Sequence, residues 1–202
     1  MQQKKIDGDL FALILTIFSY GAIIWSVIRL WIYPTTEDVK EIPYWTALIV
    51  FEFTLVHSAS LLAAWGKTWI ILILVIINLF ITSYAWAKLA PESNILLVFS
   101  VLIFSRLHSS YQNTSKNDRF KNFLISGCSL SFYFALIITI TSSPELIPNF
   151  GLTDAFLAQN NYFQYAKGSG LLIDEPKLTL AFCAAYFSVL AIFEIYFYNT
   201  HK

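Results

Sequence analysis

Three ionisable side chains, Glu52, His57 and Glu194, occur inside long apolar runs of this 202-residue chain. Arg106 and His108 lie at the end of another apolar run. A charged side chain costs about 2.5 to 3.5 kcal/mol at the centre of a bilayer, so residues of this kind predict a functional or pairing role. We therefore take these five residues as candidates for an ion or proton pathway.

Arg29 is a candidate partner for Glu52. By helical rise, Glu52 lies about 12 Å from the outer end of the second predicted span. Arg29 lies about 6 Å from the outer end of the first. An ion pair between them would fix how the two helices dock. The alternative is that Glu52 carries a proton or a cation, while Arg29 extends to the membrane interface.

The other four candidates are predicted at similar depths near the cytoplasmic side. One interpretation is a structural salt bridge between Arg106 and Glu194, with His57 and His108 hydrogen-bonded to serines. A second is a proton or ion relay, because imidazoles titrate near neutral pH. A third is a metal or haem site ligated by His57 and His108, although no HxxxH, ExxH or CxxCH motif supports it. We expect no cofactor.

Composition indicates that the bilayer is the solvent of this chain. Hydrophobic residues make up 57% and charged residues only 13% of the sequence, against about 25% charged residues in an ordinary soluble domain. The formal net charge is zero, from 13 basic and 13 acidic side chains. No four basic residues stand together, which argues against a nucleic-acid-binding surface.

The apolar runs predict an all-α, polytopic membrane bundle, because about 20 apolar residues cross a hydrocarbon core. We expect one transmembrane domain over residues 1–202, with six spans at about 10–33, 44–65, 69–87, 93–111, 120–141 and 177–198. The fourth span has an uninterrupted apolar part of only about 15 Å. It crosses only if Arg106 and His108 enter the inner leaflet, and five spans are the alternative.

The longest segment between predicted spans runs from Ser142 to Glu175. Within it, Thr153 is expected to cap a short amphipathic helix from Asp154 to about Ala166, which ends before Gly168 and Gly170. Its aromatic side chains suit the membrane interface.

Lysines and arginines near the span ends predict the orientation. The side of the amino terminus carries eight of them: Lys4, Lys5, Lys67, Arg106, Lys116, Arg119, Lys121 and Lys202. The opposite side carries five: Arg29, Lys40, Lys88, Lys167 and Lys177. This bias places both termini in the cytoplasm, with a bacterial inner membrane as the favoured location.

The function that these patterns favour is a non-catalytic subunit of a larger membrane complex. The prolines lie at span boundaries, whereas the helices of carriers are often broken by glycine and proline. A proton- or ion-coupled small-solute carrier or channel is one alternative, and a membrane haem or metal protein using His57 and His108 is another. No GxSxG, HExxH or phosphate-binding glycine loop predicts an enzyme. The expected partners are lipid, other membrane subunits or further copies of the chain.

Overall fold

The structure of the protein is a computed structural model that describes residues 2–65, 73, 76, 77, 80, 84, 116–166 and 168–199. Every regular element within these ranges is helical, so the predicted all-α class is confirmed. The four long helices are α1 (Gln2–Ile32), α2 (Ile42–Trp65), α5 (Lys116–Ser142) and α9 (Pro176–Asn199).

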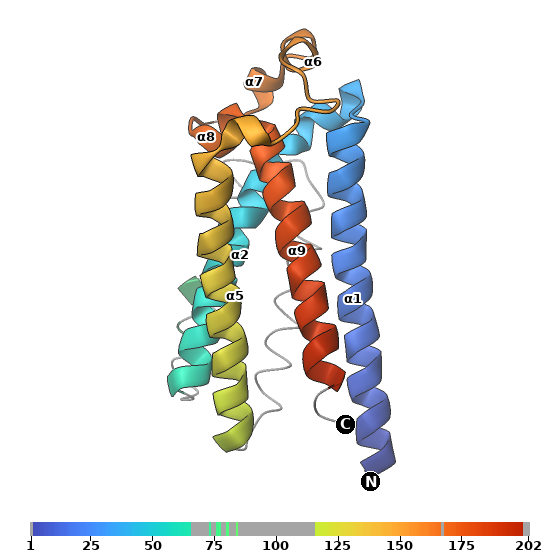
Figure 1. Cartoon of the computed structure of the whole chain (residues 1–202), viewed down its shortest axis with the longest axis vertical. Helices are drawn as coiled ribbons and strands as arrows, with labels where there is room; N and C mark the ends of the chain where they lie inside the picture. Colours follow the sequence, from blue (N-terminus) through green and yellow to red (C-terminus); the bar gives the residue numbers. More distant parts are fainter. Residues whose placement is uncertain are drawn as a thin grey trace.

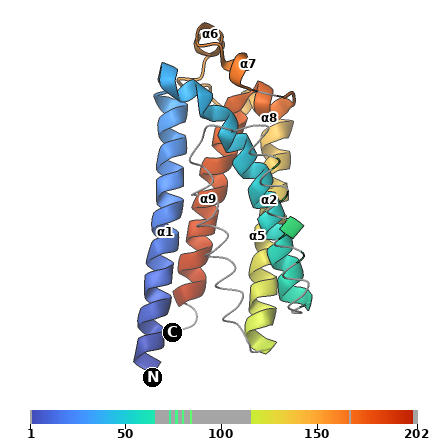
Figure 2. The same cartoon turned by 180° about the vertical axis from the view of Figure 1, so that it is seen from behind.

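The long helices run along the long axis of the molecule, with α1 and α5 antiparallel to α2 and α9 (Figures 1 and 2). Both chain termini lie at one end of the bundle, which we call the terminal end. The opposite end, the loop end, carries short helices: η1 (Thr36–Lys40), η2 (Pro144–Leu146), α6 (Asp154–Gln159), α7 (Tyr162–Tyr165) and α8 (Leu171–Asp174).

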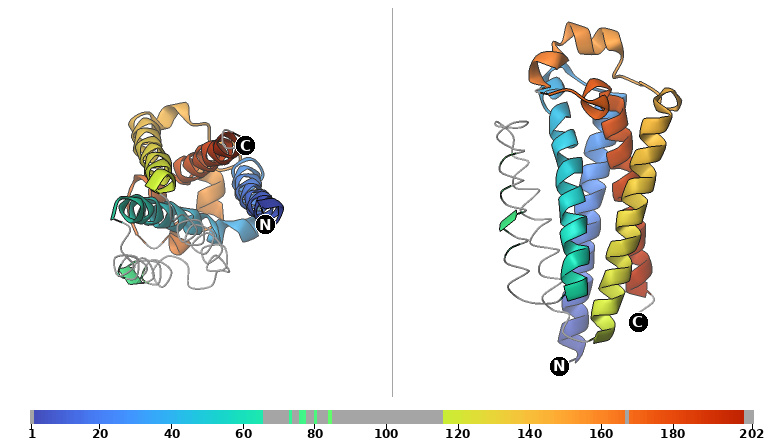
Figure 3. Two further views of the ribbon diagram at one scale, coloured as in Figure 1. Left: turned by 90° about the horizontal axis from the view of Figure 1, so that it is seen from below. Right: turned by 90° about the vertical axis from the view of Figure 1, so that its left-hand side faces the viewer.

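Helix α9 is the central helix of the described part of the bundle. It packs most extensively against α1 and also contacts α5 and α2, while α2 packs along α5. The end-on view in Figure 3 shows α9 between α1 and α5. The largest fully buried side chains come mainly from α2 and α9, and include Phe51, Phe182, Tyr186 and Phe187.

Two helices in the described ranges are long and apolar enough to cross a membrane, Leu13–Ile32 of α1 and Pro176–Tyr196 of α9. A shorter apolar helix covers Ser126–Ser142. Half of the α9 span is buried inside the protein but only 22% of the α1 span. The outward face of α1 therefore consists of exposed apolar side chains, among them Phe18 and Trp25.

Four of the predicted spans, 10–33, 44–65, 120–141 and 177–198, coincide with the four long helices. Helix α1 begins earlier than predicted, at Gln2, and α5 begins at Lys116, within the segment predicted as a loop. The predicted spans 69–87 and 93–111 lie mostly outside the described residues. Of these two, only residues 73, 76, 77, 80 and 84 of the first are described, and they are helical.

The predicted helix from Asp154 to about Ala166 is divided in the structure. Its start is confirmed, because the Phe156 N–H donates to the hydroxyl oxygen of the N-cap residue Thr153 at 3.2 Å. The helix stops after Gln159, however, and α7 begins at Tyr162. Asn161 between them adopts a left-handed conformation with φ of 53°, which ends the helical hydrogen bonding there.

Candidate functional site

A set of buried polar side chains lies between α2, α5 and α9, and we call it the polar ladder. Its members are Thr46 and Glu52 of α2, Tyr133 of α5, and Thr179, Cys183 and Tyr186 of α9. The three α9 residues are spaced four and three positions apart, so they lie on one face of that helix. The ladder is thus built by three separate helices.

The upper part of the polar ladder is a pair of threonines near the loop end. The hydroxyl oxygens of Thr46 and Thr179 lie 3.2 Å apart, and Thr179 also donates to the Leu172 carbonyl at 2.7 Å. These contacts join α2 to α9 and join α9 to the short helix α8. Because a buried hydroxyl needs a partner, they also fix the register of the two helices.

Tyr133 connects α5 to the same interface. Its hydroxyl donates to the Ile49 carbonyl of α2 at 3.1 Å. Its ring contacts Phe182 and Tyr186 of α9, with ring centroids 5.0 Å and 5.6 Å apart in edge-to-face geometry. Aromatic rings therefore fill the space between the three helices around the polar groups.

Glu52 is the charged member of the polar ladder, and its side chain is 0% exposed. It lies ten residues after the start of α2, about 15 Å along the helix axis, and Tyr186 lies at the same depth on α9. The Tyr133 hydroxyl and the Cys183 thiol are both within electrostatic range of the Glu52 carboxyl. Glu52 thus lies near the middle of α2, which runs from Ile42 to Trp65.

No protein-family model matches the chain, and no curated protein or solved structure matches it either. Within the described ranges, no group of three or more His, Cys, Asp or Glu side chains is placed to hold a metal ion.

The sequence offered Glu52 as a partner for Arg29, and the ion pair that the structure shows for Arg29 is with Asp38. Arg29 forms a bidentate ion pair with Asp38, with nitrogen to oxygen distances of 2.5 Å and 3.1 Å. The reason is local: Arg29 lies in the last turn of α1, and the chain returns Asp38 of η1 to it nine residues later. The Asp38 carboxylate also accepts from the backbone N–H and the hydroxyl of Thr35.

Asp38 gives the loop end a pH dependence. Burial alone would raise the pKa of the Asp38 carboxyl, but hydrogen bonds from Arg29 and Thr35, together with the Arg29 charge, lower that pKa below its usual range. Because the pKa is lower in the folded state than in the unfolded state, the stabilisation is complete above about pH 4 and is lost as the pH falls through the folded-state pKa.

We predict that Asp38→Asn lowers the free energy of unfolding at neutral pH by about 1.5 kcal/mol. This value is at the low end for charged hydrogen bonds because the Arg29 side chain is 42% exposed. Thermal unfolding in detergent from pH 7 to about pH 3 measures it, and the difference between wild type and variant should shrink toward acid. A difference that stays constant with pH would contradict an ionised Asp38.

The remaining predicted site residues are only partly placed. His57 belongs to α2, but its side chain lies outside the described part of the structure, as do Arg106 and His108 entirely. Glu194 is exposed near the terminal end of α9. The predicted cluster of these four residues and its three interpretations therefore remain predictions.

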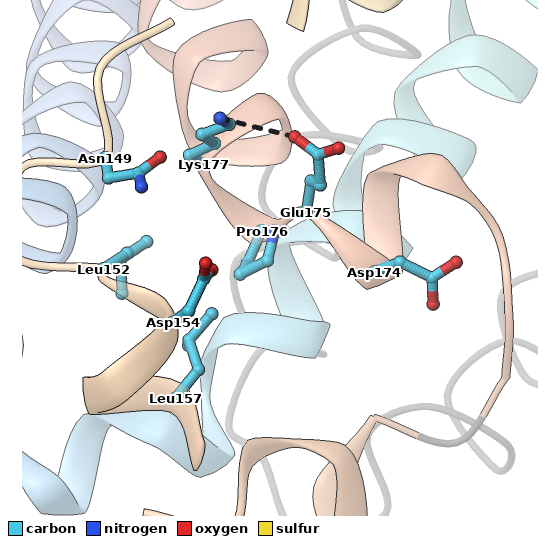
Figure 4. A pocket seen from close by; sticks show the side chains of 8 residues that line it. All are labelled: Asn149, Leu152, Asp154, Leu157, Asp174, Glu175, Pro176 and Lys177. Carbon is cyan, nitrogen blue, oxygen red and sulfur yellow. Dashed lines mark ion pairs between the residues drawn. The ribbon is translucent and has the colours of Figure 1, made fainter. Parts of the chain in front are cut away.

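A pocket of about 270 Å³ lies at the loop end, where the segment before α9 meets α6 (Figure 4). Lys177 and Glu175 form an ion pair there at 3.4 Å. Asp154, the first residue of α6, also lines the pocket. Asp174 points away from the other labelled side chains and accepts from the Gly170 N–H at 3.2 Å. The pocket thus contains acidic groups and one lysine that is already paired.

Sequence reasoning did not select Thr46, Tyr133, Thr179, Cys183 or Asp38. The threonines carry a weak signal, because each is a hydroxyl residue inside an apolar run. Tyr133 and Cys183 carry none, since aromatic residues and cysteine are common in apolar cores. Their shared interface becomes visible only when α5 and α9 are placed beside α2.

Proposed function

We propose that the chain is a multi-pass membrane protein with six transmembrane helices and both termini in the cytoplasm, and that it is a non-catalytic subunit of a larger membrane complex. The observation that carries this proposal is the construction of its long helices. α1, α2, α5 and α9 are continuous over 31, 24, 27 and 24 residues. Each exceeds the roughly 20 residues that cross a hydrocarbon core.

The packing between the helices supports a structural role more than a transport role. Carrier sites are typically formed by broken helices near the bilayer midplane. Here, α9 is a single helix at that depth, and its Phe182 and Tyr186 rings stack 5.5 Å apart. A second ring pair, Tyr20 with Phe187 at 5.8 Å, joins α1 to α9. Such ring packing favours a bundle whose helices keep fixed positions relative to one another.

Both termini lie at the same end of the bundle, which supports the orientation predicted from the distribution of lysines and arginines. With α1 and α9 antiparallel, the loop end would face the periplasm if the membrane is a bacterial inner membrane. A cysteine at exposed Ser169 should then react with a membrane-impermeant maleimide in intact cells, in a Cys128→Ser, Cys183→Ala background. A cysteine at Gln3 should react only after permeabilisation, and the reverse pattern would overturn the orientation.

The subunit role is tested by native mass spectrometry of the protein extracted from its own membranes in mild detergent. We expect a complex with a second membrane protein at a fixed stoichiometry. A monomer that moves a solute across proteoliposome membranes would instead support the carrier alternative. A Soret absorption band or stoichiometric metal in the purified protein would support the haem or metal alternative.

A further inference from the structure

We propose that α1 is a dimerisation helix, whose outward face packs against the same face of α1 in a second copy of the chain. This face is formed by Ile14, Phe18, Gly21, Trp25 and Ile28, and we call it the outer stripe. The inference rests on the membrane location proposed above. It goes beyond the subunit role, because it names a partner and the surface that binds it.

The residues of the outer stripe have the spacing of a seam between packed helices. They recur alternately four and three positions apart, which is the pattern of helices that wind around each other. All five are exposed, whereas residues on the opposite side of α1, such as Val27 and Leu30, are buried against the bundle. Figure 3 shows α1 at the edge of the bundle. The stripe is thus a packing face that no helix in the described part of the chain covers.

Gly21 makes a notch in the outer stripe between two large side chains. A Cβ atom there would meet no heavy atom within 4 Å, so the space is open in a single copy. Phe18 and Trp25, one turn away on either side, expose 73% and 71% of their surfaces. In lipid, close packing drives helix association, and small residues let the backbones approach. A facing helix requires a small residue where the backbones come closest, whereas lipid chains place no such demand.

A second copy is the occupant that fits the charges of α1. Two copies with the same membrane orientation are related by a two-fold axis along the membrane normal, so their α1 helices run parallel and each stripe residue faces its counterpart. Charged residues would then repel, but residues 10–28 contain none. Arg29 follows directly, and its charge is balanced by the ion pair with Asp38. The stripe can therefore meet itself without opposing like charges.

The exposed area of the outer stripe is at the lower limit for a stable interface. An aromatic side chain presents about 150 to 250 Å², so Phe18 and Trp25 together expose on the order of 300 Å². With the two isoleucines and the adjoining Leu15, the exposed apolar area is roughly 600 Å² per copy, or about 1,200 Å² for two, the low end for specific interfaces. We therefore expect a dimer whose population depends on the density of protein in the membrane.

Cysteine crosslinking in vesicles of phosphatidylethanolamine and phosphatidylglycerol tests the contact. In a Cys128→Ser, Cys183→Ala background, Ile28→Cys places a thiol in the stripe and Ile138→Cys places one on the exposed side of α5, each four residues before the loop end of its helix. Copper(II) phenanthroline takes two electrons from a pair of thiols, which lose two protons and form a disulfide. A disulfide needs Cα atoms within about 7 Å, so Ile28→Cys should crosslink at least about tenfold faster than Ile138→Cys.

Gly21→Val tests the notch without changing contacts inside one copy. Position 21 is open in the single chain, so the variant should fold and insert as the wild type does. Between two copies, the added side chains would occupy the space where the backbones meet. The protein density at half-dimerisation, measured by single-molecule photobleaching across lipid dilutions, should then rise at least about tenfold. Gly127→Val is the matched control on α5, where a Cβ atom also meets nothing within 4 Å, and it should leave this density unchanged.

Each contrary result has a distinct meaning. Inserted monomers at every lipid dilution would overturn the dimer alone and leave lipid on the outer stripe. Equal crosslinking of Ile28→Cys and Ile138→Cys, or a dimer unaffected by Gly21→Val, would overturn this face as the interface. A single copy of the chain in the complex seen by native mass spectrometry would assign the stripe to a different subunit. Failure to insert into vesicles would overturn the membrane location and the dimer together.

Discussion

Replacing Gly151 with alanine should lower the free energy of unfolding by about 3 kcal/mol, the upper part of the range for overpacking. A Cβ atom at this position would clash with Pro34 Cδ and would lie 2.7 Å from the Ile32 carbonyl oxygen. Neither neighbour can move freely, because one is a proline ring and the other is backbone. Thermal unfolding in detergent, followed by circular dichroism, measures the effect.

The expected loss is large because Gly151 belongs to a clamp that ties the loop end to α1. Its N–H donates to the Trp31 carbonyl at 3.1 Å, and the Trp31 indole N–H donates to the Pro148 carbonyl at 2.9 Å. The rings of Trp31 and Phe150 also meet edge to face at 5.1 Å. An added methyl group would weaken both hydrogen bonds and the ring contact at once.

Gly127→Ala is the matched control for Gly151→Ala. Gly127 lies in α5, and a Cβ atom there would meet no heavy atom within 4 Å. Alanine is the better helix former, so this variant should be neutral or more stable by about 0.5 to 1 kcal/mol. Equal destabilisation by both substitutions would contradict a specific clamp at Gly151.

Replacing Phe182 with alanine should lower the free energy of unfolding by about 2 to 3 kcal/mol. Phe182 is 1% exposed, and its ring contacts both Tyr133 and Tyr186. Truncation would leave a cavity between α5 and α9, and each aromatic pair contributes about 0.5 to 1.5 kcal/mol. If the bundle lies in a membrane as proposed, the value falls below the usual 3 to 5 kcal/mol for such a truncation, because transfer into lipid then replaces transfer into water.

Unfolding by a denaturing detergent, followed by tryptophan fluorescence, measures the Phe182 effect. Ile138→Ala is its control, since Ile138 lies on α5 with 61% of its surface exposed. If that surface faces lipid, the control should change stability by less than about 0.5 kcal/mol. A larger loss at Ile138 than at Phe182 would mean that the packed and lipid-facing sides of α5 have been exchanged.

Much of the fold could be predicted because it depends on local sequence properties. A long apolar run predicts a long helix, and four of the predicted spans coincide with long helices, two of which are long and apolar enough to cross a membrane. The Thr153 cap is equally local, since it joins residues three positions apart. The division of the helix after Gln159 was missed, because the left-handed conformation of Asn161 leaves no periodicity signal.

The candidate site was predicted only in part, for the same physical reason. An ionisable residue in an apolar run can be recognised from the sequence, and Glu52 was selected in this way. The residues that join its helix to α5 and α9 cannot, because Tyr133 and Cys183 lie 84 and 138 residues along the chain from the α2 carbonyls that they contact. The ion pair of Arg29 with Asp38 was not predicted, because depth along two helices does not reveal that the connecting turn supplies a carboxylate.

The sequence by itself thus determined the all-helical class, the positions of four long helices, and the presence of a carboxyl group inside one of them. The tertiary structure decided that α9 lies at the centre, that Arg29 pairs with Asp38, and that Tyr133 and Cys183 hydrogen-bond to the helix that carries Glu52. Helix formation follows from hydrogen bonds between residues four positions apart. The side chains that meet between helices depend instead on the rotation and register of each helix, which the whole packed bundle sets.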